Sequence, residues 1–114
     1  MPTPSERSLA IFPAGSLGEY NLPPELVRVL VRGDGAAVWD SEGRRYTDFT
    51  MGWGSVLLGH AHPAEVEAVR RRAGLGSNFA YVTEPALELA EELVRAVPCA
   101  ERIRFCASGT EATG

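Results

Sequence analysis

Three consecutive residues, Ser108, Gly109 and Thr110, have the types and spacing that suit the binding of an anion. The apolar run at residues 103–107 is typical of a buried strand, and the residues after Thr110 have the composition of a helix's first turn. A strand that turns into a helix here directs unpaired backbone N–H groups and two hydroxyls at one point, where the helix N-terminus adds partial positive charge. We therefore expect a phosphate-binding turn, with an ordinary helix cap as the alternative interpretation.

Two better-known motifs do not match this turn. A nucleotide-binding P-loop requires the pattern G-x-x-x-x-G-K-[ST], which is missing here together with its lysine. Ser108 as a nucleophile would require a G-x-S-x-G elbow and a histidine later in the chain, and neither is present. Binding of an anion is therefore favoured over these two functions, although the local pattern by itself is more often an ordinary helix cap.

Lysine is absent from the chain, since all eleven basic residues are arginine. The chain by itself can therefore form no lysine Schiff base with a carbonyl cofactor or substrate. The formal net charge is −4, and no basic cluster is interleaved with aromatic residues, so we expect no nucleic-acid partner. The one basic run, at residues 70–72, fits a solvated helix face.

Other candidate functional residues have structural explanations. His60 and His62 have no third histidine or suitably spaced carboxylate, so we expect a structural or helix-entry role rather than a metal site. Trp53, which lies between two glycines, can line a substrate pocket or pack in a core, and the residue alone favours the core. Cys99 and Cys106 are too few to predict a disulfide framework, and a reduced, buried thiol is expected at Cys106.

The composition indicates a globular protein, with 45% hydrophobic and 23% charged residues. The first residues are polar, without the apolar core of a signal peptide, and no apolar run reaches membrane length. We therefore expect a cytoplasmic location and no membrane partner.

The first part of the chain, residues 1–62, is predicted to form an N-terminal segment with an antiparallel β-meander. Gly- and Pro-rich turns separate short runs with β character. We expect a mobile lead-in at 1–10, a loop at 12–18, strands at 25–32, 36–40 and 44–50, and turns at 33–35 and 41–43. Pro24 also allows a short helix at the start of the first of these strand segments.

The second part, residues 63–114, is predicted to begin a larger cofactor-binding domain. Pro63 opens a helix to about residue 73, with an apolar face and charges that complement its dipole. A second helix is expected from the N-cap Thr83 to Pro98, with a stripe formed by Leu87, Ala90, Leu93, Val94 and Val97. The strand at 103–107 and the start of another helix follow. We expect that the chain is the front of a larger protein.

Several of these motifs, taken in order, resemble the class III aminotransferases. They are Arg32-Gly33-Asp34-Gly35-Ala36, Gly43-Arg44-Arg45-Tyr46-Thr47-Asp48-Phe49, Leu58-Gly59-His60-Ala61-His62-Pro63, Thr83-Glu84 and Phe105-Cys106-Ala107-Ser108-Gly109-Thr110-Glu111-Ala112. Pro13-Ala14-Gly15 with Gly52-Trp53-Gly54 is most similar to the glutamate-1-semialdehyde aminomutase branch. The resemblance runs from about residue 12 to 113. A related aminotransferase remains an equal alternative, because the aminomutases' substrate-carboxylate arginine falls at Asn21 on ungapped alignment.

The resemblance implies the α/β fold of a fold type I pyridoxal-phosphate enzyme, of which this chain would hold the meander, two helices and the first strand of the large-domain sheet. Ser108, Gly109 and Thr110 would bind the phosphate of pyridoxal 5'-phosphate, and Trp53 would line the substrate pocket. Such enzymes act as homodimers on a small-molecule amino donor and a carbonyl acceptor. Their cofactor-binding lysine would lie beyond Gly114, so we expect the isolated chain to be inactive.

Two other functions remain open from the sequence. The first is a small binding or interaction domain that has inherited the resemblance and lost catalysis. The second is a fragment that binds a phosphosugar or a nucleotide. This function is the least favoured, because a β-meander before the helices does not fit the start of a doubly wound domain.

Overall fold

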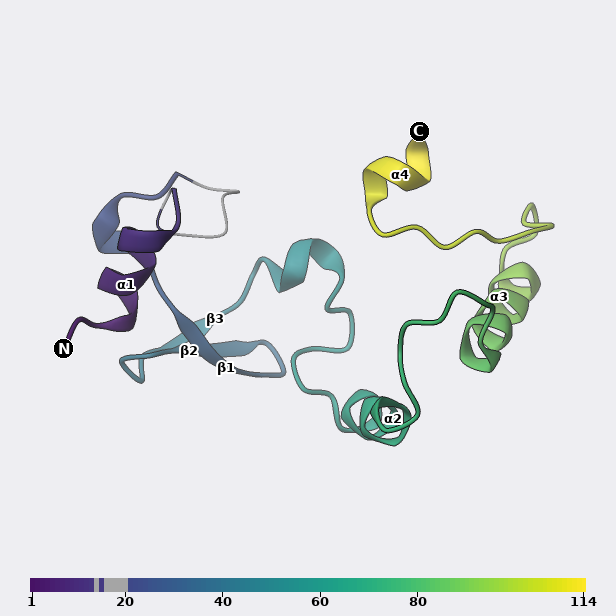
Figure 1. Cartoon of the computed structure of the whole chain (residues 1–114), viewed down its shortest axis with the longest axis horizontal. Helices are drawn as coiled ribbons and strands as arrows, with labels where there is room; N and C mark the ends of the chain where they lie inside the picture. Colours follow the sequence, from purple (N-terminus) through teal and green to yellow (C-terminus); the bar gives the residue numbers. More distant parts are fainter. Residues whose placement is uncertain (14, 16–20) are drawn as a thin grey trace. The chain divides into compact units, whose positions relative to one another are not determined.

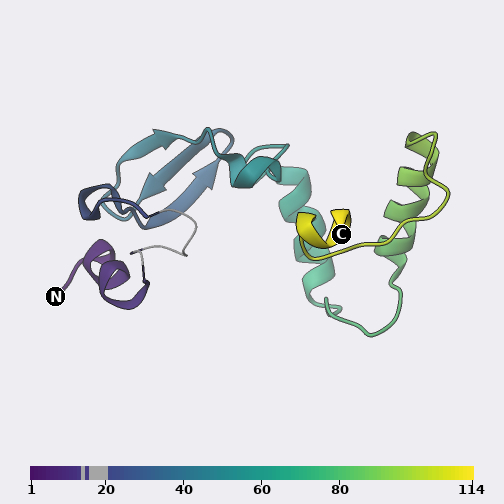
Figure 2. The same cartoon turned by 90° about the horizontal axis from the view of Figure 1, so that it is seen from above.

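Three short strands form the only sheet in the described part of the chain, which comprises residues 1–13, 15 and 21–114 of a computed structural model (Figure 1). They are β1 (Leu30–Asp34), β2 (Ala37–Asp40) and β3 (Arg45–Thr47), paired antiparallel in the order β1-β2-β3. Figure 2 shows the strands side by side. The predicted meander is therefore confirmed. The sheet belongs to the first of two units, Met1–Arg71, and the second unit is Arg72–Gly114.

The first turn of the meander lies later than predicted. Gly33 and Asp34 pair with Val38 and Ala37 inside the ladder, so the turn is made by residues 35 and 36. Gly35 has a φ of 54°, which costs glycine little and allows the tight reversal. The second turn, before β3, contains Gly43 with a φ of 80°, as its sequence indicates.

The third strand is shorter than the predicted range of 44–50. Its ladder ends at Thr47, and the backbone N–H groups of Thr50 and Met51 instead donate to the Asp48 carboxylate. A local side-chain acceptor therefore replaces a neighbouring strand, as short acidic residues often do.

The segment before the sheet contains two helical elements. A short 3-10 helix, η1 (Pro24–Leu26), precedes β1, so the strand predicted at 25–32 begins later, at Leu30. The prediction of a mobile lead-in at 1–10 is wrong, because Pro4–Ile11 forms helix α1. Its N-cap Thr3 accepts the N–H of Glu6, whose carboxylate accepts the N–H of Thr3. These two hydrogen bonds satisfy backbone N–H groups at the start of the helix, which have no partner within the helix. The loop predicted at 12–18 lies mostly outside the described residues.

The core formed by the described residues of the first unit is small. Its buried hydrophobic residues are Val27, Ala37 and Val38, and the carboxylate of Asp40 is buried beside them. Asp40 accepts two hydrogen bonds on each carboxylate oxygen, from the N–H groups of Glu42 and Arg44, Arg44 Nε and the Tyr46 hydroxyl. These bonds compensate for the loss of water around a buried charge.

Helices account for the regular structure of the rest of the chain. The 3-10 segment η2 (Met51–Gly54) follows the sheet, and α2 (Pro63–Ala73) begins and ends where the sequence predicts. In the second unit, α3 (Glu84–Ala96) follows the N-cap Thr83, and α4 (Gly109–Thr113) follows the N-cap Ser108. None of the helices in the described part combines the length and apolar composition that spanning a bilayer requires.

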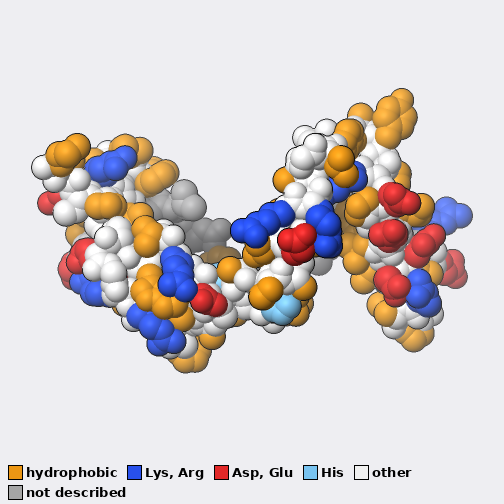
Figure 3. Space-filling view, turned by 90° about the horizontal axis from the view of Figure 1, so that it is seen from below, with side chains coloured by type: hydrophobic (Ala, Val, Ile, Leu, Met, Phe, Trp, Pro, Cys, Tyr) orange, Lys and Arg blue, Asp and Glu red, His pale blue; other side chains and the backbone are white. Residues whose placement is uncertain are grey.

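The predicted strand at residues 103–107 is wrong for this chain, and so is the expected burial of Cys106 within it, because this thiol is exposed. All residues of the second unit are described, and none of them pairs in a ladder. A strand is held by hydrogen bonds to a neighbour, and this unit provides no neighbour. The apolar stripe of α3 is also left uncovered, with Leu87 51% exposed and Val97 40% exposed. Figure 3 shows many such hydrophobic side chains on the surface.

Candidate functional site

The start of α4 holds the residues that the sequence assigns to anion binding. Ser108 is its N-cap, with extended backbone, and its Oγ accepts the N–H of Glu111 at 3.2 Å. The Glu111 carboxylate turns back to accept the N–H of Ala107 at 2.8 Å. A serine followed three residues later by a glutamate is the pattern of a capping box. Here the glutamate accepts the N–H of Ala107, whereas in a complete capping box it would accept the N–H of the N-cap residue itself.

Two donors at this turn are left without a protein acceptor. Within the described part of the chain, no hydrogen bond uses the backbone N–H groups of Gly109 and Thr110. The Ser108 hydroxyl accepts from Glu111, but its own proton is still available to donate. No atom lies within 4 Å of the point where a Cβ on Gly109 would stand, so a ligand can approach the backbone. The turn thus presents donors to open space.

Trp53 lies in a turn with left-handed backbone. Met51, Gly52, Trp53 and Gly54 have φ values of 46°, 57°, 60° and 85°. For residues with a side chain, this conformation costs about 1–2 kcal/mol each, so other contacts must hold Met51 and Trp53 there. Trp53 is 63% exposed, which excludes, for this chain, the core role that the residue alone favours.

The side chains of Asp48 and His60 form a hydrogen bond beside this turn. Their Oδ2 and Nε2 atoms lie 2.6 Å apart, and both side chains are largely shielded from solvent. The hydrogen bond from His60, with those from the N–H groups of Met51 and Thr50, lowers the pKa of Asp48, although burial opposes the shift. The backbone of His60 in turn forms an isolated antiparallel bridge with Gly35.

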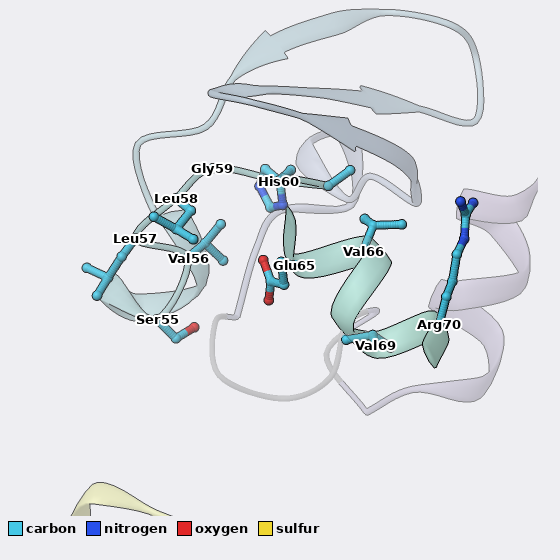
Figure 4. Close-up of a pocket in the computed structure, with 11 residues that line it drawn as sticks. Ser55, Val56, Leu57, Leu58, Gly59, His60, Glu65, Val66, Val69 and Arg70 are labelled. Atoms are coloured by element: carbon cyan, nitrogen blue, oxygen red, sulfur yellow. The ribbon is translucent and has the colours of Figure 1, made fainter. Parts of the chain in front are cut away.

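A pocket of about 810 Å³ opens next to His60 in the first unit (Figure 4). Its walls are the loop that follows η2 and one side of α2, which contributes Val66 and Val69. Glu65 and Arg70 add one charge of each sign to a mainly apolar lining. Trp53 is not among the lining residues, so this pocket is distinct from the predicted substrate-pocket wall.

The two histidines have structural contacts in the described residues. His60 pairs with Asp48, and the carbonyl of His62 accepts the N–H of Val66 in the first turn of α2. No group of three or more potential metal ligands occurs among the residues that were placed. The Nδ1 atom of His62 is buried without a hydrogen-bond partner in the same part of the chain. These contacts fit the helix-entry role expected from the sequence.

The predicted site residues therefore fall in different units, with Trp53 in the first and residues 108–110 in the second. A comparison with known families shows which kind of protein contains both regions. The sequence model of the family "Aminotransferase class-III" matches residues 21–114, which is most of the chain. The chain belongs to the class III aminotransferases.

Curated relatives of this aminotransferase chain include glutamate-1-semialdehyde 2,1-aminomutases. That of Chloroflexus aurantiacus is 54% identical over 82 residues, covering 72% of the chain and 18% of the relative. That of Neisseria meningitidis is 40% identical over 114 residues, covering 95% of the chain and 26% of the relative. The chain thus spans about a quarter or less of the length of these relatives.

Solved transaminases have the same fold as this aminotransferase chain. An omega-transaminase from Sphaerobacter thermophilus has a TM-score of 0.85 at 34% identity, over 96% of this chain and 25% of that one. A transaminase with pyridoxal phosphate bound has a TM-score of 0.84 at 32% identity, over 96% and 26%. A glutamate-1-semialdehyde aminomutase from Pseudomonas aeruginosa has a TM-score of 0.65 at 29% identity, over 80% and 20%. The expected fold, part of a pyridoxal-phosphate enzyme, is confirmed.

Pyridoxal phosphate is the cofactor of the class III aminotransferases, and the residues of this chain suit one end of it. The unpaired N–H groups of Gly109 and Thr110 and the Ser108 hydroxyl can donate hydrogen bonds to phosphate oxygens, and the start of a helix favours negative charge. The aldehyde end has no partner in this sequence, because lysine is absent.

Sequence reasoning missed two residues of this aminotransferase chain that shape these regions. The serine-to-glutamate spacing of the capping box could have indicated the role of Glu111. The pairing of Asp48 with His60 joins residues twelve positions apart, and no short-range pattern in the sequence predicts it.

Proposed function

We propose that this chain is the N-terminal quarter of a pyridoxal-phosphate-dependent aminotransferase or aminomutase. Within it, Ser108, Gly109 and Thr110 bind the phosphate of the cofactor, and Trp53 forms part of the substrate-pocket wall. The observation that supports this most is the start of α4, where two backbone N–H groups without protein acceptors follow a capped serine. Family membership supplies the identity of the anion.

The α4 turn binds the phosphate through short, directed donors. Glu111 occupies the N–H of Ala107, which leaves the next two N–H groups, those of Gly109 and Thr110, for the ligand. The hydroxyls of Ser108 and Thr110 can add charge-assisted hydrogen bonds to phosphate oxygens. Glycine at position 109 keeps the approach open.

The bound cofactor supplies an electron sink for bond breaking at the carbon that carries the substrate amine. The residues of this chain position that chemistry rather than perform it. Trp53 presents a large aromatic surface, 63% exposed here, against which a substrate can pack and exclude water. Because lysine is absent, the proton transfers belong to residues outside this sequence, and we infer that the chain alone is inactive.

The partners of the complete protein follow from the same proposal. They are a small-molecule amino donor, a carbonyl acceptor and a second copy of the protein, in the cytoplasm. The relatives named as glutamate-1-semialdehyde 2,1-aminomutases favour an amino-group transfer within one substrate as one of the two reactions. The solved transaminases favour transfer between two substrates.

The phosphate turn can be tested by NMR on the ¹⁵N-labelled chain. Pyridoxal 5'-phosphate is expected to shift the amide resonances of Gly109 and Thr110, and pyridoxal, which has no phosphate, is not. Ser108→Asp tests the residue without removing the helix cap, since aspartate caps as well as serine but repels a phosphate. It is expected to abolish the shifts, whereas Ser77→Ala, in an exposed loop of the same unit, leaves them unchanged. Equal shifts with both compounds contradict the proposal.

A chimaera tests the assignment of function. The matching segment of the Chloroflexus aurantiacus aminomutase is replaced by this chain, which is 54% identical to it over 82 residues. The chimaera is expected to bind pyridoxal 5'-phosphate and to retain aminomutase or transaminase activity, and Ser108→Asp is expected to weaken cofactor binding at least tenfold, or about 1.4 kcal/mol. A soluble chimaera that binds no cofactor would favour the non-catalytic alternative.

A further inference from the structure

The left-handed turn that carries Trp53 needs a support outside itself. Its four residues, 51–54, all have positive φ, and two of them, Met51 and Trp53, are not glycine. A Cβ atom disfavours this conformation, so the intrinsic backbone preferences of Met51 and Trp53 do not by themselves maintain the turn. Bonds within the turn include those from the Trp53 N–H to the Thr50 carbonyl, from the Ser55 N–H and hydroxyl to the Gly52 carbonyl, and from the Val56 N–H to the Met51 carbonyl.

Asp48 provides contacts that reach the turn from the sheet. Its Oδ1 accepts the N–H of Thr50 at 2.9 Å and the N–H of Met51 at 3.0 Å. Its own backbone N–H donates to the carbonyl of Ala36 at 2.8 Å, directly after β3 ends. One residue thus joins the last pairing of the sheet to the first amides of the turn.

The other carboxylate oxygen of Asp48 is fixed by His60. Nε2 of His60 lies 2.6 Å from Oδ2, and the side chain of Asp48 is only 15% exposed. The His60 backbone exchanges two hydrogen bonds of 2.9 Å with Gly35, so the histidine is attached to the end of the first hairpin.

Two glycines make this attachment close. A Cβ on Gly33 would lie 2.6 Å from Cγ of His60, and a Cβ on Gly59 would lie 3.0 Å from Cα of Gly35. Both distances are shorter than normal contacts, so only glycine leaves the imidazole in reach of Asp48. The support therefore runs from the hairpin through His60 and Asp48 to Met51.

We propose that Asp48 is a positioning residue that holds the left-handed turn at 51–54 and so fixes the orientation of Trp53, with His60 orienting its carboxylate. The link to substrate specificity rests on the proposed function, in which Trp53 is a pocket wall. The link to the turn does not, because it depends only on contacts within the first unit.

The test uses the full chain labelled with 5-fluorotryptophan. The chain has two tryptophans, so the ¹⁹F spectrum contains one resonance for the sheet residue Trp39 and one for Trp53, assigned with Trp39→Phe and Trp53→Phe. Asp48→Ala is expected to move the Trp53 resonance most of the way to its position in urea and to leave the Trp39 resonance in place. Asp48→Asn keeps an acceptor for the two N–H groups and is expected to restore the native position.

The matched control is Asp34→Ala, which removes an exposed carboxylate paired with Arg32 on the same sheet. It is expected to leave the Trp53 resonance unchanged. A Trp53 resonance that stays in place in Asp48→Ala overturns the proposal. If that variant unfolds and both resonances move, Asp48→Glu decides, because the longer side chain displaces the carboxylate but keeps the charge. The proposal requires the Trp53 resonance alone to move in Asp48→Glu, and any other result overturns it.

No cofactor or substrate enters this measurement. A chain that fails to bind pyridoxal 5'-phosphate but shows the selective loss in Asp48→Ala contradicts the proposed function and leaves the positioning role intact. The reverse result contradicts only the positioning role.

Discussion

Tyr46 and Asp40, on adjacent strands, are joined by a hydrogen bond of 2.8 Å in which the phenol donates to a buried carboxylate. The same oxygen accepts Nε of Arg44 at 2.8 Å, and the other oxygen accepts two backbone N–H groups of the β2–β3 turn. Because the described residues form so small an apolar core, this carboxylate is a principal organiser of the meander.

Removal of the Asp40 carboxylate is expected to destabilise the sheet more than removal of the Tyr46 hydroxyl that donates to it. Asp40→Ala leaves the Arg44 and Tyr46 side chains and two amides without their partner. Tyr46→Phe removes only the hydroxyl's bond to Asp40, worth about 1.5 kcal/mol, and its longer bond from Arg28 Nε. Urea unfolding followed by Trp39 fluorescence should rank Asp40→Ala below Tyr46→Phe and both below Thr47→Ala, an exposed residue of the same strand. Equal midpoints for all three variants would contradict this role of Asp40.

The stability of the first unit is expected to fall in acid. Burial alone would raise the pKa of Asp40, but the hydrogen bonds from Arg44, Tyr46 and the Glu42 N–H together lower it well below the ordinary value of 3.8. The folded state therefore binds fewer protons than the unfolded state, and stability is complete above the ordinary pKa and is lost as the pH falls toward the folded pKa. The pKa of Asp48 is shifted in the same direction.

Urea midpoints measured between pH 2 and 6 test this dependence. The slope below the ordinary carboxyl pKa should decrease in Asp40→Asn and decrease further in the double variant with Asp48→Asn. A slope that neither substitution changes would assign the acid sensitivity to other carboxylates.

A methyl group at position 33 is expected to displace His60. Gly33→Ala would place Cβ 2.6 Å from Cγ of the imidazole, and such overpacking costs about 1–3 kcal/mol. Gly74→Ala is the matched control, because it has open space and no positive φ. Thermal unfolding should show a lower midpoint for Gly33→Ala only. In NMR spectra, Gly33→Ala should also move the His60 resonances, and an unmoved imidazole would contradict the steric argument.

The N-terminal helix is expected to depend on its capping box. Thr3→Ala removes the side-chain acceptor for the N–H of Glu6 and should cost α1 about 1 kcal/mol, while Thr3→Ser should restore it. Amide hydrogen exchange of residues 6–8 measures the effect locally. Equal protection in the alanine and serine variants would show that contacts of α1 with the rest of the unit decide its stability.

The sequence alone indicated the elements that depend on local signals. Pro63, the acidic first turn and the basic last turn located α2, and two glycine-containing turns indicated the meander. The serine before α4 was likewise recognised as the end of an extended segment, because capping is a property of neighbouring residues.

Local signals failed where the outcome depends on a partner distant in sequence. The apolar run at 103–107 has strand composition, but a strand forms only against a neighbour, and the described chain contains none for it. The Asp48 carboxylate likewise binds the amides of Thr50 and Met51 with one oxygen, but its other oxygen contacts His60, which lies twelve positions away.

Residue types, short spacings and the resemblance of motifs therefore indicated the family, the meander and the helices α2 and α3, and they predict an anion-binding turn at residues 108–110. Tertiary structure alone decided that Asp40 is buried, that Asp48 reaches His60 and that the turn at 51–54 is left-handed. The physical reason is that capping and turn preferences act over three or four residues, whereas a buried carboxylate is stabilised by whichever donors the folded backbone brings to it.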